Sequence, residues 1–288
     1  WACGARLKTG QVLISIPKVD NAFQNYIFSQ SLNGIRSVFD ELGGEIIGGH
    51  TFESRNYSNK PYTIGVELAL SVQGIIKIGQ KTWNKYGMRP GDVLLMSRPL
   101  GIGVFFAACM KNINVYESSE EIFKNLVTSQ QTLIEKIHDV QKNLGKQLIN
   151  AATDITGYGF IGHLNEMIEA SNIKRREENL EKIKVTLDLN SIKAYPGILD
   201  LINQGVRSSM YSENKKIMDL NLKRDSQEKC IYFSNTRNDC KSEDFSAKKE
   251  LLFDPQTCGP LLVSCNSKYE KFFDDNWFKV GVVSKKVI

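Results

Sequence analysis

Long apolar runs are absent from this sequence of 288 residues. Spanning a bilayer takes about 18 or more consecutive apolar residues, and no stretch approaches that length, so we expect no membrane partner. Cysteine is also sparse, with six residues and no Cys-x-x-Cys pair. This excludes a disulfide-held scaffold and argues against a structural zinc site. With no signal peptide, the cysteine usage predicts a reducing, cytoplasmic compartment.

Charge of one sign is scarce as well. Lysine is interleaved with acidic residues along most of the chain, and the formal net charge is only +5. So mild an excess gives no reason to expect a nucleic-acid partner. The hydrophobic content of 41% is that of an ordinary globular protein, and the length suggests about two domains.

Strand-like and helix-like patterns alternate along the chain. Apolar residues three or four positions apart predict a helix that ends at Gly43-Gly44, and another apolar helical face extends over residues 120–144. Short β-rich runs lie between such segments, as at Asp92 to Met96. Alternating strands and helices predict an α/β fold built of α+β layers.

A composition break near residue 79 predicts two domains. We expect a first domain over residues 1–78 and a second α/β domain over residues 79–288. Residues 222–250 are rich in Lys, Asp, Ser and Asn and show no sustained apolar period. This composition predicts a flexible insertion in the second domain.

An aspartate at the end of a predicted strand is the first candidate functional residue. Asp154 is followed by a turn containing Gly157 and Gly159, after which a helix begins. A carboxylate placed so can hold Mg²⁺ while phosphates complete the coordination, and the glycine N–H groups can approach an anion. The structural alternative is that Asp154 or Thr156 caps the helix and the glycines make the turn.

The helix after this turn carries His163 and Glu166 on one face. At a spacing of three residues they are either metal ligands or a polar pair, and two residues alone favour the polar pair. Cys258 has no base evident in the sequence, so we interpret it as a buried small residue.

Two further glycine-containing segments follow predicted strands. Gly48-Gly49-His50-Thr51 is interpreted as a turn whose N–H groups, with His50 or Thr51, contact a nucleotide; the alternative is a bare turn between elements. Arg98-Pro-Leu-Gly-Ile-Gly103 is not a Walker loop, because no Gly-Lys-Ser/Thr follows at the required spacing.

Taken together and in order, these strings resemble the selenophosphate synthetase (selenide, water dikinase) family of the aminoimidazole-ribonucleotide synthetase superfamily. The strings are Gly-Gly-His-Thr, Arg-Pro-Leu-Gly-x-Gly, Ala-Thr-Asp-Ile-Thr-Gly-Tyr-Gly-Phe-Ile-Gly-His-Leu-x-Glu-Met and Asp-Pro-Gln-Thr-x-Gly. The resemblance extends from Trp1 to about Val283 and is weak over 222–250.

The resemblance implies a two-domain fold, a homodimer whose N-terminal strands form a shared barrel, and synthesis of selenophosphate from ATP, selenide and water with release of AMP and phosphate. It implies that Asp154 is one of several Mg²⁺-binding aspartates. It also implies that Gly48, Gly49, His50 and Thr51 bind ATP, in the family across the dimer interface.

Some family features are not in this sequence. The segment with a reactive Cys or selenocysteine and a lysine is absent, as are the upstream metal-binding aspartates. We therefore expect no catalytic residue after Trp1 and an N-terminal domain that is incomplete in this chain. The sequence also resembles the subgroup fused behind an NADH-dehydrogenase-like flavoprotein, which implies an oxidoreductase domain upstream.

Two alternative functions remain open at this point. One is another ATP-using member of the superfamily, of the purine, thiamine or hydrogenase-maturation type. The other is a degenerate domain that binds nucleotide without turnover. The Gly-Gly-His-Thr and Asp-Pro-Gln-Thr strings favour selenophosphate synthesis.

Overall fold

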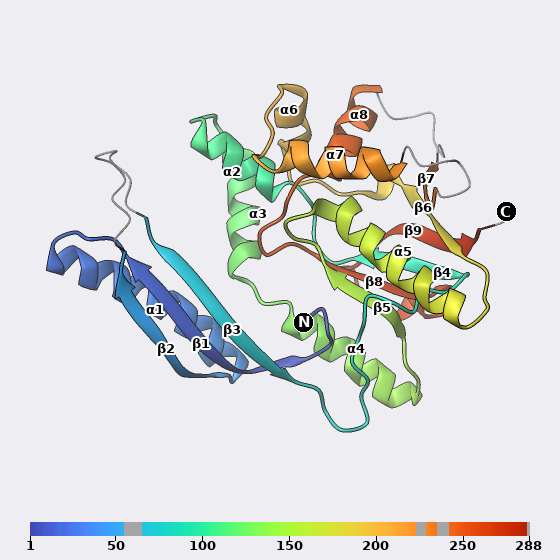
Figure 1. Cartoon of the computed structure of the whole chain (residues 1–288), viewed down its shortest axis with the longest axis horizontal. Coiled ribbons are helices and arrows are strands. Elements are labelled where there is room, and N and C mark those ends of the chain that lie inside the picture. The colour runs from blue at the N-terminus through green and yellow to red at the C-terminus, as the bar shows by residue number, and fades with distance from the viewer. Residues whose placement is uncertain (55–64, 223–228, 235–241, 287–288) are drawn as a thin grey trace. The chain divides into compact units, whose positions relative to one another are not determined.

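The computed structural model describes residues 1–54, 65–222, 229–234 and 242–286 (Figure 1). By the density of its internal contacts the chain forms two compact units. The first contains Ala5–Gln80, together with Trp1 and Ser129–Thr132. The second contains the remaining residues, from Lys81 onward and the short segment Ala2–Gly4.

The first unit has a three-stranded sheet of order β2-β1-β3. Strand β1 pairs parallel with β2 and antiparallel with β3. The parallel pair requires a crossover, which helix α1 provides. The elements are β1 (Arg6–Ile16), α1 (Asn21–Leu42), β2 (Glu45–Glu53) and β3 (Glu67–Ile75).

Helix α1 is defined at both ends by its sequence. The Asp20 side chain accepts a hydrogen bond from the Phe23 N–H, and Gly43 ends the helix in the left-handed conformation at φ 67°. The expected glycine stop is confirmed. Apolar α1 side chains such as Phe28 and Ile35 pack on Val12 and its buried neighbours on β1, forming the core of this unit.

The interpretation of Gly48-Gly49 as a turn is wrong. Both glycines lie inside β2, opposite Gln11 and Val12 of β1. A Cβ on Gly49 would lie 2.0 Å from the Val12 carbonyl oxygen, so only glycine allows the two backbones to approach this closely. The Gly-Gly pair here permits a close contact between two strands. The local sequence pattern does not distinguish such a contact from a turn.

We therefore expect Gly49→Ala to destabilise the protein by about 2 kcal/mol, because the two strands have to separate to admit the methyl group. The matched control is Gly34→Ala on α1, where a Cβ meets nothing within 4 Å and better helix propensity adds about 0.5–1 kcal/mol of stability. Urea unfolding measures both. Equal effects of the two substitutions would contradict the close approach.

The second unit has a six-stranded sheet of order β5-β8-β4-β9-β6-β7. Its pairs are antiparallel except for β6 with β7, so the sheet is mixed. The strands are β4 (Asp92–Met96), β5 (Ile149–Asp154), β6 (Ile183–Asp188), β7 (Ile231–Ser234), β8 (Leu261–Asn266) and β9 (Phe278–Lys285).

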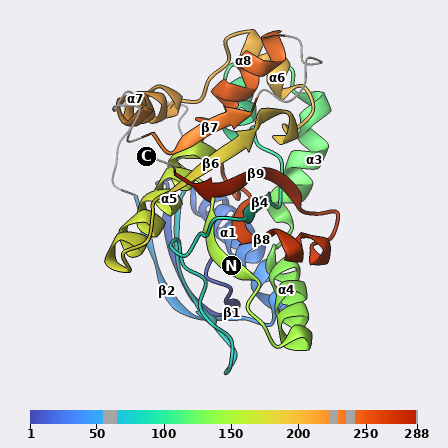
Figure 2. The ribbon, with the colours of Figure 1, turned by 90° about the vertical axis from the view of Figure 1, so that its right-hand side faces the viewer.

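Both faces of this sheet are covered. On β4, Leu94 and Met96 point into one hydrophobic cluster while Val93 and Leu95 point into another, as strand alternation requires. Helices α2, α5, α6 and α8 supply the first cluster and α4 supplies the second (Figures 1 and 2). The helices are α2 (Ile102–Met110), α3 (Tyr116–Val127), α4 (Gln131–Leu144), α5 (Gly159–Glu177), α6 (Ile198–Asn203), α7 (Tyr211–Leu222) and α8 (Ser242–Leu251), with 3₁₀ turns η1 (Leu189–Ser191) and η2 (Ser267–Phe272).

The α/β fold with two sheets is confirmed, and two predicted elements are corrected. Residues 120–144 form two helices, because the chain is extended at Thr128, whose carbonyl accepts a hydrogen bond from the buried Arg98 side chain. Within 222–250, the predicted insertion is wrong for β7, which pairs with β6, and for α8, which buries Ala247. Residues 223–228 and 235–241 lie outside the described residues.

No helix in the described ranges is long and apolar enough to cross a membrane.

Candidate functional site

Three of the sequence motifs meet at one edge of the six-stranded sheet. Strands β4 and β5 both run antiparallel to β8, so their carboxyl ends lie beside the start of β8. Met96 pairs with Leu262, and Asp154 pairs with Leu261. The segments that follow β4 and β5 and precede β8 are therefore neighbours, although Ser97 and Leu261 are 164 residues apart in the chain.

Asp154 lies where the sequence predicts it, at the end of β5, and its side chain is exposed. The Thr156 hydroxyl oxygen is 3.4 Å from Asp154 Oδ2. The structural alternative of a helix cap is not what forms, since α5 begins after Tyr158 with no side-chain cap. The Asp154 carboxylate is consequently available to a ligand at the sheet edge.

A line of polar side chains extends from Thr156 onto α5. Thr156 Oγ1 lies 3.1 Å from His163 Nε2, and His163 Nδ1 lies 3.1 Å from Glu166 Oε2. Glu166 also forms an ion pair with Lys85 at 2.5 Å. His163 is buried while Glu166 is partly exposed. The polar-pair interpretation of His163 and Glu166 is confirmed. No sequence pattern predicted that Lys85 joins them.

The segment before β8 caps helix α2. Gln256 Oε1 accepts hydrogen bonds from the Gly101 and Ile102 N–H groups at 3.0 and 3.2 Å. Asp254 Oδ2 accepts from the Val104 N–H at 3.2 Å and from Gln256 Nε2 at 3.0 Å. The free N–H groups at the start of α2 are thus satisfied by side chains about 150 residues away.

Asp254 is almost fully buried, with 1% exposure. Burial raises the pKa of its carboxyl group to about 7, although hydrogen bonds from Val104 N–H and from Gln256 act in the opposite direction. The sequence reasoning missed Asp254 and Gln256 as capping residues. No local pattern reveals them, because neither precedes the helix that it caps.

Arg98 connects the segment before β8 to the segment that follows β4. Its Nη1 donates to the Cys258 carbonyl oxygen at 2.9 Å, and burial lowers the pKa of its guanidinium. The Gln256 N–H donates to the Thr156 carbonyl, which joins the two loops directly. Cys258 is exposed, so its interpretation as a buried residue is wrong. A turn with φ 48° turns its side chain out of the core.

Gly48, Gly49, His50 and Thr51 lie in the first unit, on β2, and Asp154 lies in the second. All four positions are exposed, and the His50 and Phe52 rings stack with centroids 6.0 Å apart. Strand β2 is an edge strand. The N–H groups on its outer side therefore have no partner in this sheet.

The residues at the sheet edge suit a cation that is only partly held by protein. Among the described residues, no three His, Cys, Asp or Glu side chains gather in a way that could hold a metal ion. Mg²⁺ commonly uses one or two carboxylates and completes its shell with water and phosphate oxygens. An exposed carboxylate with a hydroxyl 3.4 Å away fits that mode and does not fit an all-protein cage.

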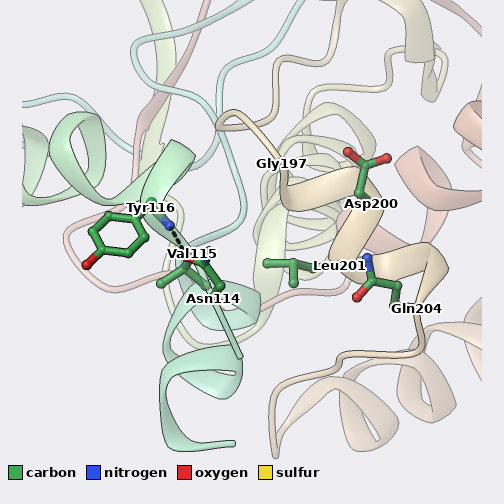
Figure 3. Close-up of a pocket in the computed structure, with 7 residues that line it drawn as sticks. All are labelled: Asn114, Val115, Tyr116, Gly197, Asp200, Leu201 and Gln204. Carbon is green, nitrogen blue, oxygen red and sulfur yellow. Dashed lines mark hydrogen bonds between the residues drawn. The ribbon is translucent and has the colours of Figure 1, made fainter. Parts of the chain in front are cut away.

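A pocket of about 240 Å³ lies elsewhere in the second unit, between the start of α3 and helix α6 (Figure 3). Its side chains do not converge, since the Tyr116 ring and the Asp200 carboxylate point in different directions. None of the sequence-predicted site residues lines it. The lining residues are Asn114, Val115, Tyr116, Gly197, Asp200, Leu201 and Gln204.

Comparison with known sequences finds one family model that is similar to part of the second unit. Residues 89–190 match the family described as AIR synthase related protein, C-terminal domain. This part of the chain is similar to an AIR-synthase-related C-terminal domain. The match begins just before β4 and contains Arg98, Asp154 and His163, while Asp254 lies beyond it.

Curated relatives extend the likeness to most of the length of the chain. It is 27% identical over 242 residues to a selenide, water dikinase of Caldanaerobacter subterraneus, covering 84% of this chain and 58% of that protein. It is 26% identical over 266 residues to selenide, water dikinase 2 of Peptoclostridium acidaminophilum, covering 91% and 63%. The chain thus spans about three fifths of the length of these relatives.

Solved structures share its fold. Thiamine monophosphate kinase from Aquifex aeolicus superposes with a TM-score of 0.59 at 15% identity, covering 99% of this chain and 73% of that one. The E. coli hydrogenase maturation protein HypE gives 0.61 at 13% identity, with 99% and 70% covered. The resemblance inferred from the motifs is confirmed at the level of the superfamily and its fold.

Proposed function

We propose that the protein is a selenide, water dikinase that converts ATP, selenide and water into selenophosphate, AMP and phosphate. The observation that carries this proposal is the sequence likeness to selenide, water dikinases over 84% and 91% of the chain. Thiamine monophosphate kinase and HypE share the fold at only 15% and 13% identity, which gives their specific activities less support.

ATP is the proposed phosphoryl donor. Related structures have been solved as thiamine monophosphate kinase with AMPPCP and as HypE with ATP. Phosphoryl transfer needs metal charge and well-placed N–H donors more than covalent help from the protein. The exposed outer edge of β2 at Gly48, Gly49, His50 and Thr51 offers such donors, and we assign these residues to the nucleotide.

Mg²⁺ is the proposed metal, with Asp154 as one ligand. When bound, it would neutralise charge on the phosphates. Asp154 would hold it through a carboxylate that leaves room for phosphate oxygens and water, as its exposed position at the end of β5 permits.

A second copy of the chain is the proposed partner. Strand β3 is exposed at every position, including the apolar side chains of Leu68, Leu70, Val72 and Ile75, which are 43–54% exposed. An exposed, apolar edge strand is normally paired or covered. The dimer implied by the family resemblance would cover it.

We expect Leu70→Lys to weaken this dimer, since it would bury a charge in the proposed interface. The shift toward monomer at a given concentration is measured by sedimentation velocity. The matched control is Met110→Lys, on the exposed end of α2 in the second unit, which should leave the association unchanged. A wild-type chain that stays monomeric at every concentration would rule the dimer out.

The proposed reaction is tested by measuring AMP release from Mg²⁺ and ATP with and without selenide, under reducing conditions, using the full-length natural protein. Selenide-dependent AMP release supports the proposal. Release of ADP that depends on thiamine monophosphate, or ATP use that is indifferent to selenide, would favour another activity of the superfamily.

A further inference from the structure

The Thr156 hydroxyl group lies between two acceptors and has only one hydrogen to donate. Its oxygen is 3.1 Å from His163 Nε2 and 3.4 Å from Asp154 Oδ2. Hydrogen bonds from hydroxyl groups usually span about 2.5–3.0 Å, so the contact with Asp154 is the longer and weaker of the two. The tautomer of the His163 ring decides which acceptor receives the hydrogen.

The other side of the His163 ring indicates its tautomer. Nδ1 faces Glu166 Oε2 at 3.1 Å, and a carboxylate can only accept, so Nδ1 carries the hydrogen. Lys85 forms an ion pair with the same carboxylate oxygen at 2.5 Å and offsets its charge. In the neutral ring Nε2 is then an acceptor, and it takes the Thr156 hydrogen.

We propose that His163 is a positioning residue that keeps the Thr156 hydroxyl hydrogen away from Asp154. With the hydrogen directed to His163, Thr156 turns a lone pair toward the Asp154 carboxylate. Asp154 Oδ2 and Thr156 Oγ1 then form an edge of two acceptors, 3.4 Å apart, that attracts a cation. The inference rests on the proposed function, in which Asp154 binds Mg²⁺.

Lys85 and Glu166 act through His163. The side chains of this line come from three places in the second unit. Lys85 lies in the segment before β4, Thr156 in the loop after β5, and His163 and Glu166 on helix α5. His163 has only 7% of its side chain exposed, so water does not readily replace either of its partners. Removing the ring acceptor would release the Thr156 hydrogen to Asp154, where it would compete with the cation.

The first test is the tautomer of His163 in the full chain, measured by long-range ¹H–¹⁵N NMR at mildly alkaline pH. The chain has three histidines, and His138 serves as an internal reference. Its Nε2 lies 2.7 Å from the Gly4 carbonyl oxygen, which can only accept, so His138 carries its hydrogen on Nε2. We expect the opposite tautomer, Nδ1–H, for His163. An Nε2–H tautomer or a doubly protonated His163 ring would overturn the proposal.

The second test is a double-mutant cycle on the binding of Mg²⁺ with a non-hydrolysable ATP analogue, measured by calorimetry. We expect His163→Leu to weaken binding by about 10-fold and His163→Gln, which retains an acceptor, to restore most of it. In a Thr156→Val background the hydroxyl is absent, so His163→Leu should have no further effect. An equal loss in both backgrounds would show a merely structural role and overturn the inference.

The two tests separate the inference from the proposed function. A full-length natural protein that binds no Mg²⁺-nucleotide would refute the proposed function and the role of His163 within it. Normal binding with the wrong His163 tautomer, or with additive effects in the cycle, would refute the positioning role alone.

Discussion

Replacing Asp154 with Asn is expected to lower the rate of the proposed reaction by about 10²–10³-fold, the usual loss when one electrostatic contact to a transferring group is removed. The substitution keeps the size of the side chain and removes its charge. Asp154 is exposed at the end of β5, and within the part of the chain that the structure describes its side chain contacts Thr156 at 3.4 Å. The fold should therefore tolerate the change while Mg²⁺-nucleotide affinity falls.

The matched control for this experiment is Asp275→Asn, which removes the same charge from another exposed position of the second unit. It should leave both nucleotide affinity and rate unchanged. Thermal unfolding of the two variants should agree with that of the wild type, because neither carboxylate is buried. Wild-type affinity in Asp154→Asn, by calorimetry, would remove Asp154 from the metal site.

The fold could be read from the sequence where a local pattern determines a local structure. Helix α1 has apolar residues at helical spacing and a left-handed glycine at its end, and both signals lie within the element itself. The position of Asp154 could be predicted for the same reason, since a β-rich run and a glycine turn flank it.

Errors arose where distant residues decide the local structure. Gly48 and Gly49 form a strand and not a turn because β1 approaches them, and nothing near them in the sequence reports that approach. The helical periodicity over 120–144 continues through Thr128. The helix nevertheless ends there, because the Arg98 side chain donates a hydrogen bond to the Thr128 carbonyl oxygen. Local periodicity cannot register a partner thirty residues away.

The candidate site shows the same division. Asp154 and His163 could be selected from one motif, whereas Lys85, Asp254 and Gln256 reach the site only through the tertiary fold. Asp254 in particular has no sequence signal as a cap, because the helix that it caps precedes it in the chain. Its burial is a property of the sheet edge as a whole.

The buried carboxyl group of Asp254 is expected to make folding stability fall as pH rises toward neutrality. Burial raises its pKa to about 7 in the folded state, whereas an aspartate in the unfolded chain titrates near pH 4. Between these two values the folded state keeps a proton that the unfolded state has lost. The contribution of Asp254 to stability is therefore fully present below about pH 4 and is lost as pH rises through about 7, by up to about 4 kcal/mol in total.

Asp254→Asn tests this directly, since an amide stays neutral at every pH. The amide oxygen can still accept the hydrogen bond that the Val104 N–H donates to Asp254 at 3.2 Å. The measurement is urea unfolding at several pH values from about 5 to 8. Other titrating groups are common to both proteins, so the difference between the two curves isolates Asp254. The variant should gain stability relative to wild type by up to about 1.4 kcal/mol per pH unit between about pH 5 and 7, and the difference should level off above the folded-state pKa of about 7. Parallel curves would mean that Asp254 is ionised in the folded protein throughout, with the N-terminus of α2 stabilising its charge against burial.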